Sequence, residues 1–470
     1  MARFSNLIAV AAAVSIEVAA AADIFAHFMV QNSYAYDVAR WRTDMKAAKR
    51  IGVDAFALNW VPPHCDGDLS WQADRVQDAF TAAEQMNFKL VHSFDMSWSE
   101  CDTYWTQTYM QDILSQNAGS SAMYRWNSNI LVTTYGGDQV AQYGNAFFQG
   151  LKDGMKASSN SITLVPALSK YSYGAQSDPE GSAKRMISDF SSIDGYLNWQ
   201  AWPLDEHKNM TVEADRAFQS ALKKAGKTGP YIMSISPWQY KNLNNGNPWD
   251  AWVQYSDTLF PDRFESITKD DAFQPDIIEL ISWNDWPESH YLRDLPSQDV
   301  GATDYAELGD FSNYVRRHEH GGWRIIAKYY ISWWKTGKAP KITKDRVVYW
   351  YRVHPKDAAC SGGTSTAIRN HMYPEDAVFA WALVKKGATI SMSAGSNTHE
   401  FHADSKGPSM GRVSFPSDLS GGVTPEVAII RNGKTKHWSK GSQPITDACE
   451  WENYNPVVGV CRGQAKLTAW

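Results

Sequence analysis

Short runs of β-branched and apolar residues recur along the first 290 residues of the chain. A run of this kind, bounded by turn residues, is typical of a buried strand. Between consecutive runs lies enough chain for a loop, a helix and a return loop. The runs occupy residues 23–30, 53–59, 88–95, 129–134, 162–167, 193–199, 231–236 and 277–283.

The segments between these runs place apolar residues at helical intervals. The clearest one, at residues 38–51, is followed by Gly52, a good helix stop. The others lie at residues 72–86, 140–155, 183–190 and 212–225. Strands that alternate with helices favour parallel pairing, and eight such strands close a (β/α)₈ barrel. An open doubly wound sheet is the alternative, although no GxGxxG motif follows the first strand.

The pattern changes toward the C-terminus. Residues 311–335 carry an apolar stripe typical of a packing helix. From Val347 onward, short alternating runs are separated by Gly, Ser, Asn and Pro, as in an antiparallel β-sandwich. We therefore expect an α/β fold, with a (β/α)₈ TIM barrel over residues 23–340 and a C-terminal antiparallel β-sandwich over residues 341–470.

The N-terminus has the order of a secretory signal. One early arginine is followed by an apolar run at residues 7–16 and by small residues at 19–22. We expect residues 1–22 to be a signal peptide and the mature protein to be secreted, at the cell exterior or in the cell wall. No later stretch has the length and apolarity of a membrane span, so we expect no membrane partner.

The cysteines fit an oxidising compartment. Cys65 and Cys101 lie far from the other three, so we expect them to form a disulfide. The pairing among Cys360, Cys449 and Cys461 stays open. The sequon at Asn209 predicts N-glycosylation of a secreted chain.

Composition narrows the choice of partners. Lys and Arg total 45 and Asp and Glu total 51, which gives a net charge of −6 and makes nucleic acid an unexpected partner. The chain holds 21 Trp, 22 Tyr and 18 Phe. This aromatic excess indicates either a large core or flat rings that stack on sugars. We expect a monomer.

The densest group of polar residues follows the eighth predicted strand, at residues 283–291 (WNDWPESHY). In a (β/α)₈ barrel, catalytic groups lie at the C-terminal ends of the strands. Asp285 and Glu288 stand three residues apart between aromatic residues. Glycosidic bond hydrolysis uses a pair of carboxyl groups as catalysts. One donates a proton, and the other attacks the sugar or activates water. The alternative is a surface turn with a solvated Glu288.

Other strand ends supply further candidates. Asp95 is suited to binding a sugar hydroxyl, to acting as the base or to a structural hydrogen bond. His27 has no HxH neighbour, which argues against a metal-dependent barrel hydrolase. We interpret His318-Glu319-His320 as a solvated helix start rather than a metal site. No GxSxG or P-loop motif is present.

Six segments occur in the order found in a known family. They are FAHFMV at 25–30, DAFALN at 54–59, SFDM at 93–96, TYGG at 134–137, ISPW at 235–238 and WNDWPESHY at 283–291. The chain resembles glycoside hydrolase family 71, the fungal α-1,3-glucanases also called mutanases. It departs from that pattern at Gln31 and at Trp286-Pro287.

The resemblance implies a barrel with a C-terminal β-sandwich, hydrolysis of the α-1,3-glucosidic bonds of α-1,3-glucan with inversion, and no metal or other cofactor. It places the catalytic pair on Asp285 and Glu288. We assign Glu288 as general acid and Asp285 as general base, and the sequence leaves the opposite assignment open. The substrate-binding candidates are His27, Asn59, Trp60, Asp95, Tyr135, Trp199, Trp238, Asn284, His290 and Tyr291.

Two other functions remain open from the sequence. One is a non-catalytic polysaccharide-binding protein on a barrel scaffold. The other is a glycosidase for a different glucan linkage, or a retaining transglycosylase. Carboxyls about 5–5.5 Å apart favour retention, whereas inversion requires about 6.5–9.5 Å.

Overall fold

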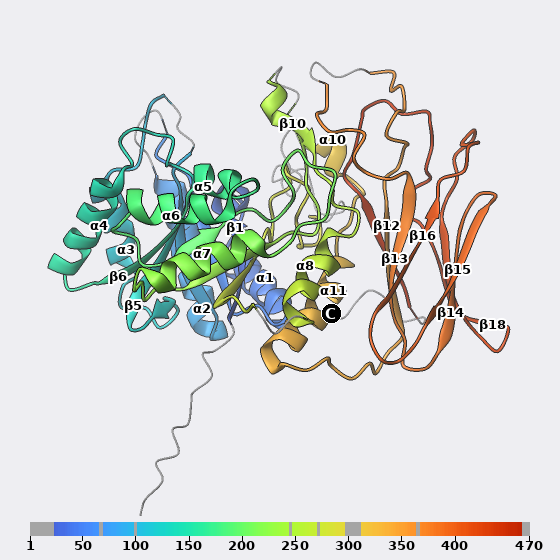
Figure 1. Cartoon of the computed structure of the whole chain (residues 1–470), viewed down its shortest axis with the longest axis horizontal. Coiled ribbons are helices and arrows are strands. Elements are labelled where there is room, and N and C mark those ends of the chain that lie inside the picture. The colour runs from blue at the N-terminus through green and yellow to red at the C-terminus, as the bar shows by residue number, and fades with distance from the viewer. Residues whose placement is uncertain are drawn as a thin grey trace, which may run out of the picture.

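The computed structural model describes residues 23–64, 69–97, 101–243, 247–269, 273–296, 312–362 and 367–462 (Figure 1). The expected signal peptide at residues 1–22 lies outside this range. Two units stand side by side, with the helices α8 and α11 between them (Figure 1). Within the described residues, no helix is long and apolar enough to cross a membrane.

The first unit is a barrel of eight parallel strands, which confirms the predicted fold. Their order is β6-β5-β3-β2-β1-β11-β8-β7. The ring closes between β6 and β7, where the backbone N–H groups of Asp194 and Gly195 donate to the carbonyl oxygen of Leu164 at 2.9 and 3.2 Å. The strands are β1 (Asp23–Met29), β2 (Ala55–Trp60), β3 (Lys89–Asp95), β5 (Asn129–Tyr135), β6 (Ile162–Ala167), β7 (Tyr196–Asn198), β8 (Tyr231–Ile235) and β11 (Ile277–Leu280).

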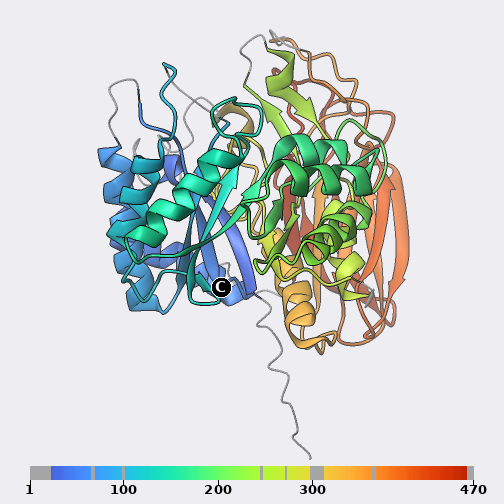
Figure 2. The same ribbon diagram turned by 60° about the vertical axis from the view of Figure 1, so that its left-hand side comes forward.

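Helices cover the outside of these strands (Figure 2). The helices of the described residues are α1 (Val38–Ile51), α2 (Ser70–Met86), α3 (Gln107–Gln116), α4 (Asn145–Ala157), α5 (Ser169–Gly174), α6 (Pro179–Asp189), α7 (Glu213–Lys224), α8 (Leu259–Thr268), α11 (Trp323–Thr336) and the short α10 (Ser312–Val315), which lies beside β10 (Ala251–Val253; Figure 1). Helix α1 illustrates how the sequence sets their ends. The side chain of Asp37 accepts a hydrogen bond from the Arg40 N–H, and Gly52 ends the helix in the left-handed region with φ 98°.

The inside of the barrel changes from apolar to polar toward the carboxyl ends of the strands. An apolar cluster draws on all eight strands and includes Phe25 and Ile277. Successive side chains alternate between the two faces of a strand. His27 and Glu279, two residues further along β1 and β11, therefore face the same interior as that cluster.

The second unit is the predicted antiparallel β-sandwich. One sheet has the order β16-β13-β12-β19 and the other β15-β14-β17-β18. Its strands are β12 (Arg346–Tyr351), β13 (Ala377–Leu383), β14 (Ala388–Ala394), β15 (Asn397–Ala403), β16 (Ser409–Ser414), β17 (Glu426–Arg431), β18 (Lys434–Lys440) and β19 (Val457–Cys461).

Strand β12 is buried on both faces. Val347, Tyr349 and Tyr351 pack between the two sheets of the sandwich. Val348 and Trp350 pack instead in the large core that the barrel and its helices share. Both faces of this strand therefore need apolar side chains, which explains the uninterrupted run VVYWY.

His318 and His320 lie at this junction, so the interpretation of His318-Glu319-His320 as a solvated helix start is wrong. The two imidazoles are 3% and 0% exposed. The ring of His320 stacks on Tyr291 with 3.9 Å between centroids. Residues far away in the sequence bury them, including Pro456, whose carbonyl oxygen lies 3.1 Å from Nε2 of His320.

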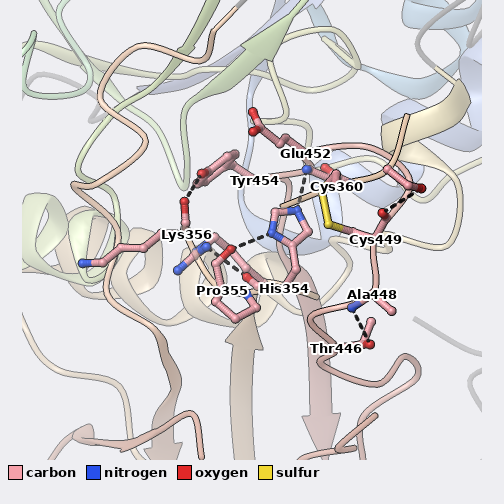
Figure 3. Close-up of a disulfide and its surroundings, with 12 residues drawn as sticks. His354, Pro355, Lys356, Cys360, Thr446, Ala448, Cys449, Glu452 and Tyr454 are labelled. Atoms are coloured by element: carbon pink, nitrogen blue, oxygen red, sulfur yellow. Dashed lines mark hydrogen bonds between the residues drawn. A yellow bond between two sulfur atoms is a disulfide. The ribbon is translucent and has the colours of Figure 1, made fainter. Parts of the chain in front are cut away.

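Cys360 and Cys449 form a disulfide (Figure 3), while Cys461 is a buried free thiol. The expected bridge between Cys65 and Cys101 involves Cys65, which lies outside the described residues. The side chain of Asn209 is exposed and donates to Oδ2 of Asp262 at 3.2 Å. Its glycosylation stays a prediction.

Removing the disulfide should destabilise the protein. Cys360 and Cys449 are 89 residues apart in the sequence, so the bridge limits the freedom of a long stretch of unfolded chain. We expect the double variant Cys360→Ser, Cys449→Ser to lose up to about 4 kcal/mol in the free energy of unfolding. Urea unfolding of both proteins checks this, and equal midpoints with equal slopes would contradict it.

Candidate active site

The segment after β11 is fixed to the end of β1 by backbone contacts. The N–H of Trp283 donates to the carbonyl oxygen of His27 at 2.7 Å. The side chain of Asn284 accepts from the N–H of Met29 at 2.8 Å and donates to its carbonyl oxygen at 3.1 Å. Asn284 is fully buried, so this side chain positions the loop.

Beyond Asn284 a tight turn brings the two carboxylates together. Oγ of Ser282 lies 2.9 Å from the N–H of Asp285, and the N–H of Glu288 donates to Oδ1 of Asp285 at 3.2 Å. A set of ligand atoms, one each from Asp285, Glu288 and His290, lies within 4.8 Å of one another. The side chains of Asp285 and Glu288 are 13% and 23% exposed.

His290 is the third member of this cluster. It is 1% exposed, and its ring stacks on Trp202 with 5.6 Å between centroids. Nδ1 lies 3.0 Å from Oγ of Ser282. Nε2 lies 3.3 Å from Oε2 of Glu288 and 3.9 Å from Oδ2 of Asp285. The imidazole is therefore held at both nitrogens, with Nε2 directed at the carboxylates.

Gln239 and Lys241 also contact Glu288, and the sequence analysis missed both. Strand β9 (Tyr240–Asn242) pairs with β10 (Ala251–Val253) in a hairpin after β8. Nε2 of Gln239 donates to Oε2 of Glu288 at 3.0 Å. Nζ of Lys241 lies 3.5 Å from Oε1 of Glu288 and 3.2 Å from Oδ1 of Asp250. The sequence feature that could have indicated both residues is their spacing of two positions, which places their side chains on the same face of an extended strand.

These surroundings move the pKa values of the two carboxyls in opposite directions. Burial raises the pKa of Asp285 to about 6, although the nearby His290 opposes the rise. Burial would also raise the pKa of Glu288, but Lys241, His290 and the hydrogen bond from Gln239 outweigh it and hold that pKa at about 2. Between these values, Asp285 carries a proton and Glu288 is ionised.

The family profile described as "Glycosyl hydrolase family 71" matches residues 20–469. The chain belongs to glycosyl hydrolase family 71. Glucan endo-1,3-alpha-glucosidase agn1 of Schizosaccharomyces pombe is 29% identical over 444 residues, covering 93% of this chain and 94% of that protein. A mutanase of Penicillium rubens is 32% identical over 449 residues, covering 94% and 89%.

Among solved structures, a GH99 endo-alpha-mannosidase from Bacteroides thetaiotaomicron overlaps 67% of this family 71 chain and 98% of its own. The TM-score is 0.45 at 11% sequence identity. A structural similarity this low says nothing about the site.

Several predicted residues of this family 71 chain gather beside the cluster. The ring of Trp199 lies 4.7 Å from that of His27 and 4.6 Å from that of Tyr135. Burial, together with the charges and hydrogen bonding of Tyr173, Glu288 and Asp95, raises the pKa of Tyr135. Oδ1 of Asp95 accepts from the N–H and hydroxyl of Ser97. Asn59, 2% exposed, is the last residue but one of β2 and pairs with Met29 at the end of β1.

Three predicted aromatic residues are instead engaged in packing. Trp60 is 1% exposed in the barrel core and donates to Nδ1 of His92. Trp238 donates to the carbonyl oxygen of Tyr454. Tyr291 is fully buried and donates to the carbonyl oxygen of His318. Their ring faces are covered by protein, and we leave them out of the proposed sugar site.

Glu279, also missed from the sequence, lies beneath the site. Its Oε1 is 2.7 Å from Nδ1 of His27, and both side chains are buried. The carboxylate therefore favours the tautomer of His27 with a proton on Nδ1. Glu279 lies inside an apolar strand (IIEL), where a single acidic residue was the available signal.

Proposed function

We propose that this family 71 enzyme hydrolyses α-1,3-glucosidic bonds in α-1,3-glucan, with Asp285 and Glu288 as its catalytic pair. The name of the Schizosaccharomyces pombe relative supports the linkage. The observation that carries the proposal is the meeting of two carboxyls at the carboxyl end of β11, with Lys241 and Gln239 contacting only Glu288 of the two. A protein that only bound polysaccharide would not need two adjacent carboxyls held in such different surroundings.

The roles in this proposal are the reverse of those that we assigned from the sequence. Asp285, with its raised pKa, is the donor to the leaving oxygen. Glu288, ionised beside Lys241, is the base that takes a proton from the attacking water. The ring of Trp199 stacks on a glucose unit, while His27, Asn59, Asp95 and Tyr135 contact its hydroxyl groups. His290 orients the two carboxylates.

Anomer-resolved NMR of the first products released from α-1,3-glucan tests this proposal. We expect β-anomeric products, because water activated by Glu288 attacks the face opposite the leaving group. Release of reducing ends from α-1,4- or β-1,3-glucan instead would contradict the linkage. Absence of new reducing ends from every glucan would favour a binding protein.

Retention is a second candidate mechanism, favoured by one distance. A pair of oxygens from Asp285 and Glu288 lies within 4.8 Å, which is shorter than the about 6.5–9.5 Å of an inverting pair and close to the about 5–5.5 Å of a retaining pair. In that mechanism Glu288 attacks the sugar itself. Its first products would be α-anomers, so the same NMR experiment separates the two mechanisms.

We also propose that the enzyme is secreted and acts as a monomer. The Cys360–Cys449 disulfide and the exposed sequon at Asn209 both suit an oxidising export route. The polysaccharide is then its expected partner outside the cell.

A further inference from the structure

A segment of the second unit adds a strand-like contact to the β9–β10 hairpin. This segment, residues 367–373 between β12 and β13, is called the clamp below. The N–H of Arg369 donates to the carbonyl oxygen of Ala251 at 3.0 Å, and the N–H of Val253 donates to that of Arg369 at 3.0 Å. The hairpin that carries Lys241 is thus held through its backbone by the sandwich unit.

The side chain of Arg369 holds the same hairpin through its tryptophans. Its guanidinium carbon lies 4.5 Å from the ring centroid of Trp249 and 5.8 Å from that of Trp252. Nζ of Lys241 lies 5.1 Å from the ring of Trp252. Trp252 therefore connects Arg369 to the lysine beside Glu288.

The clamp also holds the loop after β7. Arg369 forms an ion pair with Asp205 at 3.4 Å, and the hydroxyl of Tyr373 donates to the carbonyl oxygen of Asp205 at 2.8 Å. The ring of Tyr373 stacks on His207 with an interplanar angle of 8°. The same loop carries Trp202, on which His290 stacks.

A second segment of the sandwich unit, which includes Glu452, contacts strand β9 of the hairpin. The hydroxyl of Tyr240 donates to the carbonyl oxygen of Glu452 at 2.8 Å. The Cys360–Cys449 disulfide joins this segment to the connection that contains the clamp (Figure 3). Two covalently linked segments therefore contact the loops that carry Lys241 and Trp202.

We propose that the β-sandwich unit is a working part of the catalytic centre, in which Arg369 is a positioning residue that fixes Lys241 against Glu288. The proposal rests on the hydrolytic function proposed above. Loosening the clamp lets Lys241 withdraw from Glu288, so the carboxylate loses its nearest positive charge and binds a proton more readily. The barrel alone would keep Asp285, Glu288 and Lys241 but would lack the contacts from the clamp that hold Lys241 against Glu288.

Other charged groups act on Glu288 and limit the size of the effect. His290 and Asp285 lie on its own loop, and Asp250 shares Lys241 with it. Tyr135, Tyr173 and Tyr314 interact electrostatically with Glu288 from β5, α5 and α10. The clamp contacts none of His290, Asp285 and Glu288 by a hydrogen bond or ion pair described above, so it acts through Lys241 and Trp202.

The test is the variant Arg369→Ala, assayed on soluble α-1,3-oligosaccharides and compared with Arg369→Lys. We expect Arg369→Ala to lower kcat about tenfold, since small displacements of catalytic groups have effects of this size. The acidic limb of its pH profile should move to higher pH, while KM changes by less than about twofold. Arg369→Lys keeps a cation over the tryptophan rings and should recover part of the rate.

Arg185→Ala is the matched control, because Arg185 forms an exposed ion pair with Asp178 on α6. It should leave kcat and the pH profile unchanged. If Arg369→Ala fails to fold, Tyr373→Phe removes only one hydroxyl from the clamp and should lower kcat about threefold. Wild-type kcat and pH profile in the folded clamp variants, or a change in KM alone, would overturn the proposal.

Failure of this inference is distinguishable from failure of the proposed function. A wild-type enzyme without activity on α-1,3-glucan would contradict the function. An active wild-type enzyme with equally active, folded clamp variants would contradict the role of the clamp alone.

Discussion

Replacing Glu288 with Gln, or Asp285 with Asn, is expected to lower kcat on α-1,3-glucan about 1,000-fold. Each change keeps the size of the side chain and removes one proton-transfer function. The glutamine side chain in Glu288→Gln cannot take a proton from water. The asparagine side chain in Asp285→Asn cannot give a proton to the leaving oxygen. A reducing-sugar assay over hours measures the residual rate.

The exposed Glu400 on β15 provides the control for this prediction. Glu400→Gln makes the same chemical change far along the sandwich and should retain full activity. Thermal unfolding of all three variants shows whether they are folded. Folded Asp285→Asn and Glu288→Gln enzymes with near-normal turnover would remove this pair from the mechanism.

The enzyme should have an acidic pH optimum. Its active form needs Glu288 ionised and Asp285 protonated, with pKa values of about 2 and about 6. As pH rises through about 6, Asp285 loses the proton that it must donate, so kcat/KM should fall about tenfold for each further pH unit. As pH falls toward 2, Glu288 gains a proton and activity is lost on that side as well.

Initial rates on a soluble α-1,3-oligosaccharide between pH 3 and pH 8 measure the optimum and the basic limb of this profile. Buffers of constant ionic strength keep screening of Lys241 and Glu288 the same throughout. An optimum above pH 7 would contradict the assignment of Asp285 as the proton donor.

The barrel was predictable from the sequence because most positions of its strands are buried and carry apolar or β-branched residues. All eight predicted runs overlap strands β1, β2, β3, β5, β6, β7, β8 and β11. The β9–β10 hairpin was missed, since its stability comes from Arg369 and other residues more than 100 positions away. Helix α8 was missed too, and its sequence LFPDRFESIT carries a proline in its first turn.

The candidate site likewise combines residues that the sequence predicted with residues that it did not. Asp285, Glu288 and His290 are neighbours in the sequence, so one segment was enough to predict that they meet. Lys241 reaches Glu288 from another loop of the barrel, and Glu279 reaches His27 across 252 positions. Local sequence does not encode such contacts, because only the closed barrel brings these strand ends together.

The two buried faces of β12 limit how this protein can be rearranged. A shortened chain that stops after α11 would expose the surface around Trp323, on which the ring of Trp350 packs at 4.9 Å. Grafting the sandwich onto another barrel would in turn leave Val348 and Trp350 without their neighbours on the barrel side. The two halves therefore cannot be exchanged as independent cassettes, and a chimera must carry the barrel and the sheet that contains β12 together.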